Sequence, residues 1–334
     1  MAPLLPGARI FYAYLASAFV LAIVSYIYFS TREEDARPEG ISGGMIRYLF
    51  DPRVWLHKSA QQDYVFFFFN GLIYYGVLAQ LLVSGHIFFG VFALGLESVF
   101  GAQETAVFAP STSTAVAFTL AVALVIDLAV WVTHYLQHKV IVLWQFHKVH
   151  HSAEVLTPAT VYRMHPVDLL FTGLVSVVLT AFAFALFSYL TAATPQSVTV
   201  MNVNIIIFAF YLLGYNLRHS HIWLSYPAWL SYIFISPAQH QTHHSIDEKH
   251  YDKNFGLIFA FWDWLFGTLY VPKGYEKLEF GINREEPNPF RTITEIYLKP
   301  FSMAWDLVAP KNVRRTLICL AAVGGAAIVG GIVL

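Results

Sequence analysis

The sequence predicts an all-α integral membrane protein with about four core transmembrane helices, flanking N- and C-terminal spans, and a histidine-rich cap on the cytosolic side. Of the 334 residues, 57% are hydrophobic and 12% are charged, whereas soluble domains carry about 25% charged residues. The mean hydropathy is +0.55. Against this apolar background, 12 of the 14 histidines fall within residues 134–250. The chain therefore combines a lipid-compatible body with one polar, histidine-rich layer.

Composition also excludes several classes of protein. The net charge is −1, so the chain has no basic field for binding nucleic acid. The single cysteine, Cys319, excludes an internal disulfide framework. The first apolar run, residues 10–29, is longer than the roughly 7–15-residue core of a signal peptide, so we expect a spanning helix there.

Apolar runs long enough to span a bilayer, roughly 17–25 residues, define the predicted helices. The Gly-containing segment 85–100 is expected to be re-entrant or interfacial. Two aromatic-rich segments, 222–236 and 256–271, are expected to form interfacial helices. Residues 31–63 and 272–314 are predicted polar connectors. The predicted spans lie near residues 10–29, 64–84, 114–133, 168–192, 196–216 and 316–334.

The distribution of basic residues predicts the orientation of these spans. Of the 20 Lys and Arg, five lie in residues 30–63, three in 134–167 and eleven in 217–315. The loops 85–113 and 193–195 contain none. Because basic loops stay on the cytosolic side, the three basic regions and the histidines within them are predicted to face the cytosol. We therefore expect a multi-pass protein with its active site on the cytosolic face.

Eight histidines form three tight clusters with helical spacing: His134 with His138, then His147, His150 and His151, then His240, His243 and His244. Residues at i, i+3 and i+4 share one face of a helix, so each cluster is expected to present its imidazoles to one point. Neutral imidazole is a common metal ligand. Since one structural zinc takes about four ligands, eight clustered ligands predict a centre for two metal ions.

Two further histidines, His165 and His219, lie at the ends of predicted spans and reach the same layer; the alternative for each is an interfacial polar residue. His221 and His250 are expected to be solvated or to support the ligands. His57 and His86 are isolated and are excluded.

Three polar residues are candidate hydrogen-bond partners of the ligands. Asp127 lies inside a predicted span, two helical turns before His134, and an acid within a membrane is a functional hypothesis by default. Its alternative role is a helix–helix hydrogen bond. Asp168, three residues after His165, and Asn216, three before His219, could orient those two rings.

These motifs resemble the fatty acid hydroxylase/sterol desaturase superfamily, whose members are membrane di-iron enzymes. The order HxxxH, HxxHH and a distant second HxxHH matches. So do RMHPVD around His165, NLRHSHI around His219, and DKNFGLIFAFWDWLFGTLY over residues 252–270. The likeness covers about residues 114–272. It implies a helical membrane core capped by a cytosolic di-iron site.

The resemblance also implies the site residues and the chemistry. Two iron ions and O2 would oxidise a C–H bond of a lipid such as a sterol, fatty acyl chain or alkylglycerol. The implied domains are an N-terminal anchor and connector at 1–63, a second span and loop at 64–113, the di-iron core at 114–272, and a connector with a C-terminal helix at 273–334. The implied iron ligands are His134, His138, His147, His150, His151, His165, His219, His240, His243 and His244.

Electrons are expected from a separate reductase, ferredoxin or cytochrome b5-type donor, because the chain has no dinucleotide-binding glycine motif. The tail after the last cluster resembles the branch that includes alkylglycerol monooxygenase, for which a pterin is the alternative donor. A desaturase working on the same site is the main alternative function. A metal transporter is disfavoured because its ligands should lie near the membrane midplane. The oligomeric state stays open.

Overall fold

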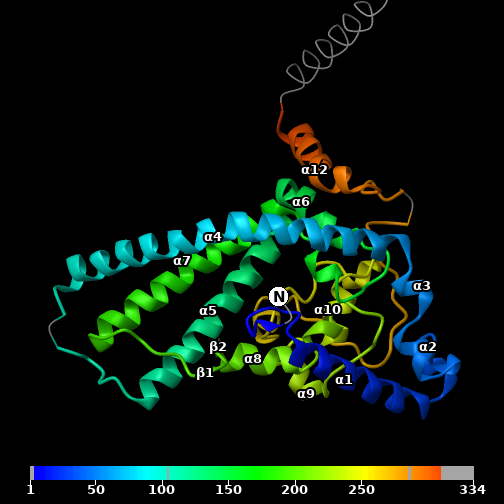
Figure 1. Cartoon of the computed structure of the whole chain (residues 1–334), viewed down its shortest axis with the longest axis horizontal. Helices are drawn as coiled ribbons and strands as arrows, with labels where there is room; N and C mark the ends of the chain where they lie inside the picture. Colours follow the sequence, from blue (N-terminus) through cyan, green and yellow to red (C-terminus); the bar gives the residue numbers. More distant parts are fainter. Residues whose placement is uncertain (1–3, 104, 285–286, 310–334) are drawn as a thin grey trace, which may run out of the picture.

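The computed structural model describes residues 4–103, 105–284 and 287–309 and is mostly helical (Figure 1). Three long helices form an elongated arm, and short helices and loops gather at the other end. The helices are α1 (Tyr12–Ser30), α2 (Met45–Leu49), α3 (Pro52–Trp55), α4 (Lys58–Phe100), α5 (Thr112–Lys139), α6 (Ile141–His151), α7 (Pro166–Thr191), α8 (Ile205–Leu212), α9 (Ala228–Ser231), α10 (Pro237–His243), α11 (Phe261–Leu265) and α12 (Ile293–Val308). Short 3-10 turns are η2 (Glu34–Ala36), η3 (Ile41–Gly43), η4 (Thr160–Tyr162), η5 (Tyr215–Leu217) and η6 (Glu248–His250), and one hairpin pairs β1 (Thr199–Val200) with β2 (Val203–Asn204).

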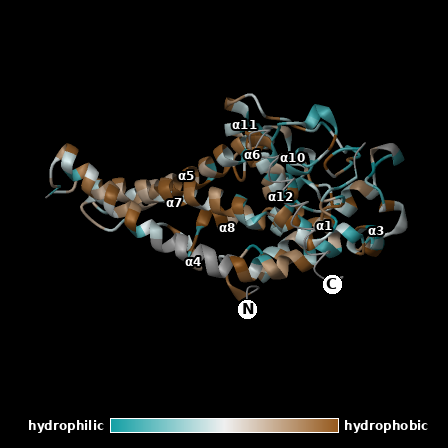
Figure 2. Cartoon of the chain, turned by 90° about the horizontal axis from the view of Figure 1, so that it is seen from above, coloured by the Kyte–Doolittle hydropathy of each residue, from teal (hydrophilic) through white to brown (hydrophobic). Residues whose placement is uncertain are grey.

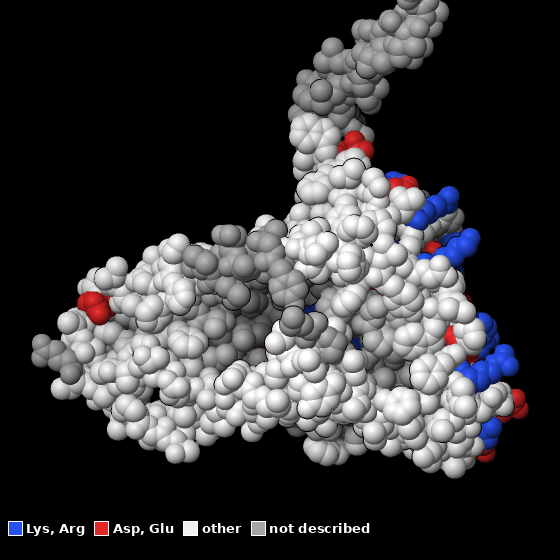
Figure 3. Space-filling model, in the orientation of Figure 1, with Lys and Arg blue, Asp and Glu red and all other residues white. Residues whose placement is uncertain are grey.

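The arm is built from α4, α5 and α7, in which α7 packs against both of the other helices. Side-chain caps fix where two of them begin. A capping box of Ser111 and Thr114 starts α5, and His165 caps α7 with Pro166 in its first turn, where proline is pre-organised for a helix. The arm is hydrophobic along its length (Figure 2). In the view of Figure 3, nearly all charged side chains lie at the opposite end of the molecule.

Among the described residues, three helices are long and apolar enough to cross a membrane: α1, α5 and α7. They confirm the helices predicted near 10–29, 114–133 and 168–192. The predicted span 316–334, including Cys319, lies outside the described residues.

The predictions for 64–84 and 85–100 were wrong in one respect, because both segments belong to the single 43-residue helix α4. Its glycines do not break it. A glycine inside a helix costs only about 1 kcal/mol relative to alanine, which the packing of α4 along α7 can offset. At Gly85, the backbone of α4 lies close enough to α7 that a Cβ would meet Val177 at 3.5 Å.

The predicted span 196–216 was also wrong. The segment folds into the β1–β2 hairpin followed by α8, which has only eight residues and is about 12 Å long at 1.5 Å per residue. Met201 and Asn202 make the turn at positive φ. The Asn204 side chain caps α8 and donates to the carbonyl of Thr119 at 2.9 Å. The chain thus returns beside α5 without a second full-length helix.

The aromatic segments 222–236 and 256–271 are mainly loops that contain only the single turns α9 and α11, so the predicted interfacial helices were wrong. The predicted connector 272–314 contains a 16-residue helix, α12, which the sequence analysis missed. Its buried residues, Ile296, Pro300 and Ala304, recur every four residues. This stripe places α12 against α6, next to the histidines.

A buried ion pair ties α4 to the chain between α6 and α7. Arg163 and Asp63 have fully buried side chains, and Nη1 of Arg163 lies 2.8 Å from Oδ1 of Asp63. Arg163 also donates to the carbonyl of Val149 at 3.1 Å, and Asp63 accepts from the Thr160 hydroxyl at 2.6 Å. The two buried charges are partners of each other. Removing one of them would leave the other buried and uncompensated.

We therefore expect Asp63→Asn to lower the free energy of unfolding by about 3–5 kcal/mol. The measurement is the thermal midpoint of the purified protein in detergent. Glu279→Gln is the matched control, because Glu279 pairs with Arg284 on the surface, where both side chains are more than half exposed. It should change the midpoint little. Equal midpoints for both variants would contradict a structural role for the buried pair.

Candidate metal centre

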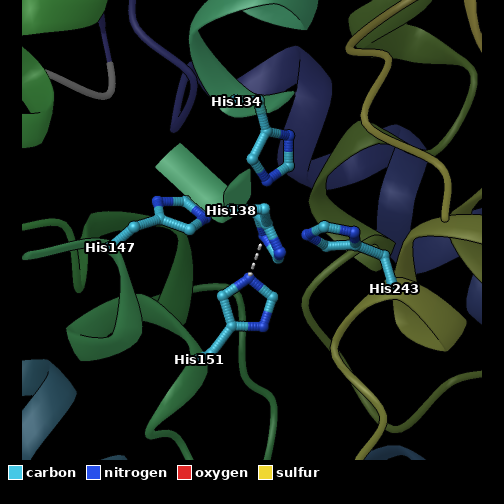
Figure 4. Close-up of side chains that lie close together, drawn as sticks. All are labelled: His134, His138, His147, His151 and His243. Atoms are coloured by element: carbon cyan, nitrogen blue, oxygen red, sulfur yellow. Dashed lines mark hydrogen bonds between the residues drawn. The ribbon is translucent and has the colours of Figure 1, made fainter. Parts of the chain in front are cut away.

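Nine histidines gather in two adjoining groups, and in each group the nearest ring nitrogens lie within 4.8 Å of one another. We call them the five-histidine group and the four-histidine group. Figure 4 shows the first, with its rings arranged around a common centre. The five-histidine group contains His134, His138, His147, His151 and His243; the four-histidine group contains His150, His219, His240 and His244.

The helices divide the histidines differently from the prediction that each cluster faces one point. In each HxxHH motif, the two residues four apart turn to one group and the middle residue turns to the other. His147 and His151 of α6 join the five-histidine group while His150 joins the four-histidine group. In α10 the assignment is reversed, since His240 and His244 join the four-histidine group and His243 the other. Each motif therefore links the two groups.

Hydrogen bonds at the outer nitrogens orient the five-histidine group. Nδ1 of His134 lies 2.9 Å from the carbonyl oxygen of Phe255, and Nδ1 of His243 lies 2.7 Å from that of Lys253. Nδ1 of His147 lies 3.3 Å from Oδ2 of Asp168. These acceptors place the hydrogen on Nδ1 and leave a lone pair on Nε2. The same three Nε2 atoms are buried and have no hydrogen-bond partner, which fits a bound metal ion.

In the four-histidine group, the Nε2 atoms face one another directly. Nε2 of His219 lies 3.0 Å from that of His240, 3.1 Å from that of His244 and 3.2 Å from that of His150. A neutral imidazole has one donor and one acceptor nitrogen, so these Nε2 atoms can pair with one another where one ring of a pair carries its hydrogen on Nε2. Where the hydrogen lies on Nδ1, the Nε2 lone pair is available to a cation bound between the rings.

Burial keeps these rings neutral, as metal ligands must be. Desolvation lowers the pKa of His147 to about 3. It also holds the pKa values of six others well below the usual range: His150, His151, His219, His240, His243 and His244. The charge of Arg218 adds to this lowering for His219 and His240 and, as the smallest cause, for His243.

His165 lies outside both groups. Its Nδ1 accepts from the backbone N–H of Val167 at 3.1 Å, and its Nε2 lies 3.0 Å from the carbonyl oxygen of Tyr297 in α12. Both ring nitrogens therefore have protein partners. His221 and His250 are also outside the groups: Nε2 of His221 faces the carbonyl of Tyr48, and Nε2 of His250 lies 3.1 Å from Oε2 of Glu276.

Comparison with known proteins agrees with this arrangement. Residues 119–268 match the model of the fatty acid hydroxylase family. The chain is 29% identical to an ornithine lipid hydroxylase of Rhizobium tropici over 50% of its own length and 46% of that protein. It is 26% identical to human alkylglycerol monooxygenase over 48% of its own length and 33% of that enzyme.

The segment 119–268 belongs to the fatty acid hydroxylase superfamily. The chain matches less than half of the length of either of these two relatives. No solved structure matches the chain significantly.

Of the three polar residues predicted to support the ligands, Asp168 faces a ring of the five-histidine group, whereas Asp127 and Asn216 have backbone partners. Asp127 contacts no ligand ring; its carboxylate accepts the backbone N–H groups of Ile258 and Phe259 at 2.6 and 3.1 Å. Asp168 faces His147 and not His165, because the α7 N-terminus turns the carboxylate toward α6. Asn216 donates to the carbonyl of Arg9 at 3.1 Å.

The sequence analysis quoted residues 252–270 only as a motif of the resemblance and assigned no role to the loop, which carries two of the carbonyl acceptors. Asp252 and Asn254 adopt positive φ values of 57° and 59°, which Asp and Asn tolerate better than most residues. The turn aims the carbonyls of Lys253 and Phe255 at the five-histidine group. Asp263 holds the loop by accepting the N–H groups of Phe255 and Gly256 at 2.9 and 2.8 Å. The DKNFG and WD elements of this family member thus act on the ligands through the backbone.

Gly256 is the point at which this loop tolerates no side chain. A Cβ there would lie 2.5 Å from the carbonyl oxygen of Phe259 and 3.1 Å from Oδ2 of Asp263. We expect Gly256→Ala to displace the loop, to lower the free energy of unfolding by about 1–3 kcal/mol, and to reduce the metal bound per chain. Thermal midpoint and metal analysis test this. Gly95→Ala, with nothing within 4 Å of the added Cβ, is the control. It should leave the metal content unchanged and, because alanine favours the α4 helix by about 1 kcal/mol over glycine, should not lower the midpoint.

Proposed function

We propose that this chain is a membrane-bound oxygenase that uses two iron ions and O2 to hydroxylate a C–H bond of a lipid. The observation that carries the proposal is the pair of adjoining, fully imidazole-lined groups within the segment that matches the fatty acid hydroxylase family. The named relatives are a lipid hydroxylase and a monooxygenase, which supports oxidation of a lipid.

In this proposal the protein's part is to bind and orient the ions and to keep water away from them. All nine rings belong to buried or half-buried residues. Imidazoles hold the ions without adding negative charge next to lipid. Imidazole ligands suit iron, zinc, copper and nickel, and the family favours iron. Two bound irons would supply the redox chemistry that activates O2.

The lipid is proposed to approach from the hydrophobic arm. Helices α5 and α7 join the arm to the site, since His134 and His138 lie near the end of α5 and Asp168 lies in the first turn of α7. Apolar side chains such as Val116, Leu120 and Leu170 are exposed along these helices. A lipid hydrocarbon chain that lies against these side chains could reach the histidines without crossing the charged end of the molecule.

The charged end is the proposed cytosolic side, in agreement with the positive-inside argument. A separate reductase, ferredoxin or cytochrome b5-type protein would deliver electrons there. A cavity of about 460 Å³ opens at this end. Its lining includes Ser220 and Gln241, which follow His219 and His240 in the sequence.

The metal content tests the proposal first. Protein expressed with iron and purified in detergent should contain about two irons per chain, because each group offers at least four nitrogen ligands. His147→Ala should lower the content, and His250→Ala should not, because His250 is equally buried but bonded to Glu276. Elemental analysis measures both. One zinc per chain, or no metal in a folded protein, would contradict the oxygenase proposal.

The product distinguishes hydroxylation from desaturation. We expect lipid extracts of cells that express the protein to contain a lipid with one added oxygen atom, which should derive from O2 when the gas is isotopically labelled. Cells that express His243→Ala should lack it, because His243 is one of the inward-facing ligands. Mass spectrometry of the extracts reads this out. A lipid that has lost two hydrogen atoms would instead indicate a desaturase.

A further inference from the structure

Arg218 is a buried cation in contact with the four-histidine group. The residue is 2% exposed. Its Nη2 lies 2.7 Å from Nδ1 of His240 and donates to the carbonyl of Gly256 at 3.1 Å. Its Nη1 donates to the carbonyl of Leu257 at 2.5 Å. The guanidinium is therefore fixed between the backbone loop and one of the four imidazoles.

This contact favours a different tautomer of His240 from the one assigned to His134, His147 and His243, whose hydrogens lie on Nδ1. Arginine has only donors, so Nδ1 of His240 must accept, and the hydrogen of the neutral ring then sits on Nε2. That Nε2 faces His219 and His244 at 3.0 and 3.2 Å. In this tautomer His240 offers no lone pair to the centre. Before a metal can use His240, the ring must move its hydrogen to Nδ1 and lose the bond from Arg218.

The charged residues near the two groups also favour a cation in the five-histidine group over one in the four-histidine group. In the five-histidine group, Asp168 lies 3.3 Å from His147, and Asp252, which also pairs with Lys139, lies 3.7 Å from His138. The four-histidine group instead has the Arg218 cation at hydrogen-bond distance. Asp127 attracts Arg218 electrostatically, but its oxygens are bonded to the backbone N–H groups of Ile258 and Phe259. Carboxylates favour a bound cation and a guanidinium opposes it.

We propose that Arg218 makes the four-histidine group the weaker of two metal positions, so that the five-histidine group fills first. Partly loaded protein then carries its ion among His134, His138, His147, His151 and His243. The inference rests on the proposed function for the presence of two ions. It adds which ion is held firmly and which residue sets the difference.

The test is a titration of metal-free, detergent-purified protein with Co²⁺ in competition with a chromophoric chelator. Wild type should bind two ions with dissociation constants at least about tenfold apart. His243→Ala should weaken the tight class, because only four imidazoles remain in that group, and should leave the weak class unchanged. His244→Ala should remove the weak class and leave the tight one. Two classes of equal affinity, or loss of the tight class in His244→Ala, would overturn the inference.

Two charge variants test the cause. Arg218→Met should tighten the weak class at least about tenfold, whereas Arg218→Lys, which keeps the charge, should tighten it much less. An unchanged weak class in folded Arg218→Met overturns the role of Arg218. Asp168→Asn is an independent variant on the other group; it should weaken the tight class only, and an unchanged tight class overturns the electrostatic argument. A wild type that never binds two Co²⁺ ions contradicts the proposed function itself.

Discussion

The desolvation of nine imidazoles is the constraint on which the rest of this structure depends. Each ring nitrogen needs a donor, an acceptor or a cation once water is removed. The protein supplies oxygen acceptors at the outer nitrogens of His134, His147 and His243 and leaves their inner nitrogens without a protein partner. Without an ion these inner atoms would carry an unsatisfied desolvation cost. The fold is therefore arranged around positions that bound cations would complete.

Eight of the nine histidines come from α5, α6 and α10 with its C-cap, and His219 follows η5. Backbone carbonyls set the tautomers of His134 and His243, and this requires a rigid loop. Asn254 donates to the carbonyls of Gln239 and Tyr270, both at 2.9 Å, and Asp263 accepts from the Trp131 indole at 3.0 Å. These bonds join the loop to α10 and α5, the helices that carry ligands. A buried carboxylate with several N–H and O–H partners is stable in such a place. The acids of this region therefore act on the metal positions indirectly, by holding the backbone.

Local patterns explain which features could be predicted from the sequence. The helical spacing of His134 and His138, and of the two HxxHH motifs, reports local geometry, and those segments are helical in the structure. The division of each motif between two groups depends on how α5, α6 and α10 cross, which spacing alone does not contain. Hydropathy found α5 and α7 but misread residues 196–216, where Asn202 and Asn204 turn the chain. It also missed α12, because the role of its amphipathic stripe becomes evident only from the packing of α12 against α6.

Two buried arginines have opposite effects on the net charge of their surroundings in this fold. The charge of Arg163 is matched by Asp63 at 2.8 Å. This ion pair fixes two segments of the chain to each other and adds no net charge to the surrounding residues. Arg218 has backbone carbonyls and one imidazole as its bonded partners. These occupy Nη1 and Nη2, leave the buried Nε without a hydrogen-bond partner, and do not neutralise the charge. A carboxylate bonded to Arg218 would have made its surroundings equivalent to those of Arg163. Asp127 attracts Arg218 electrostatically but does not bond to it, since its oxygens accept the backbone N–H groups of Ile258 and Phe259. The guanidinium therefore lies against the four-histidine group without a bonded carboxylate, and the proposed difference between the two metal positions follows from this contact.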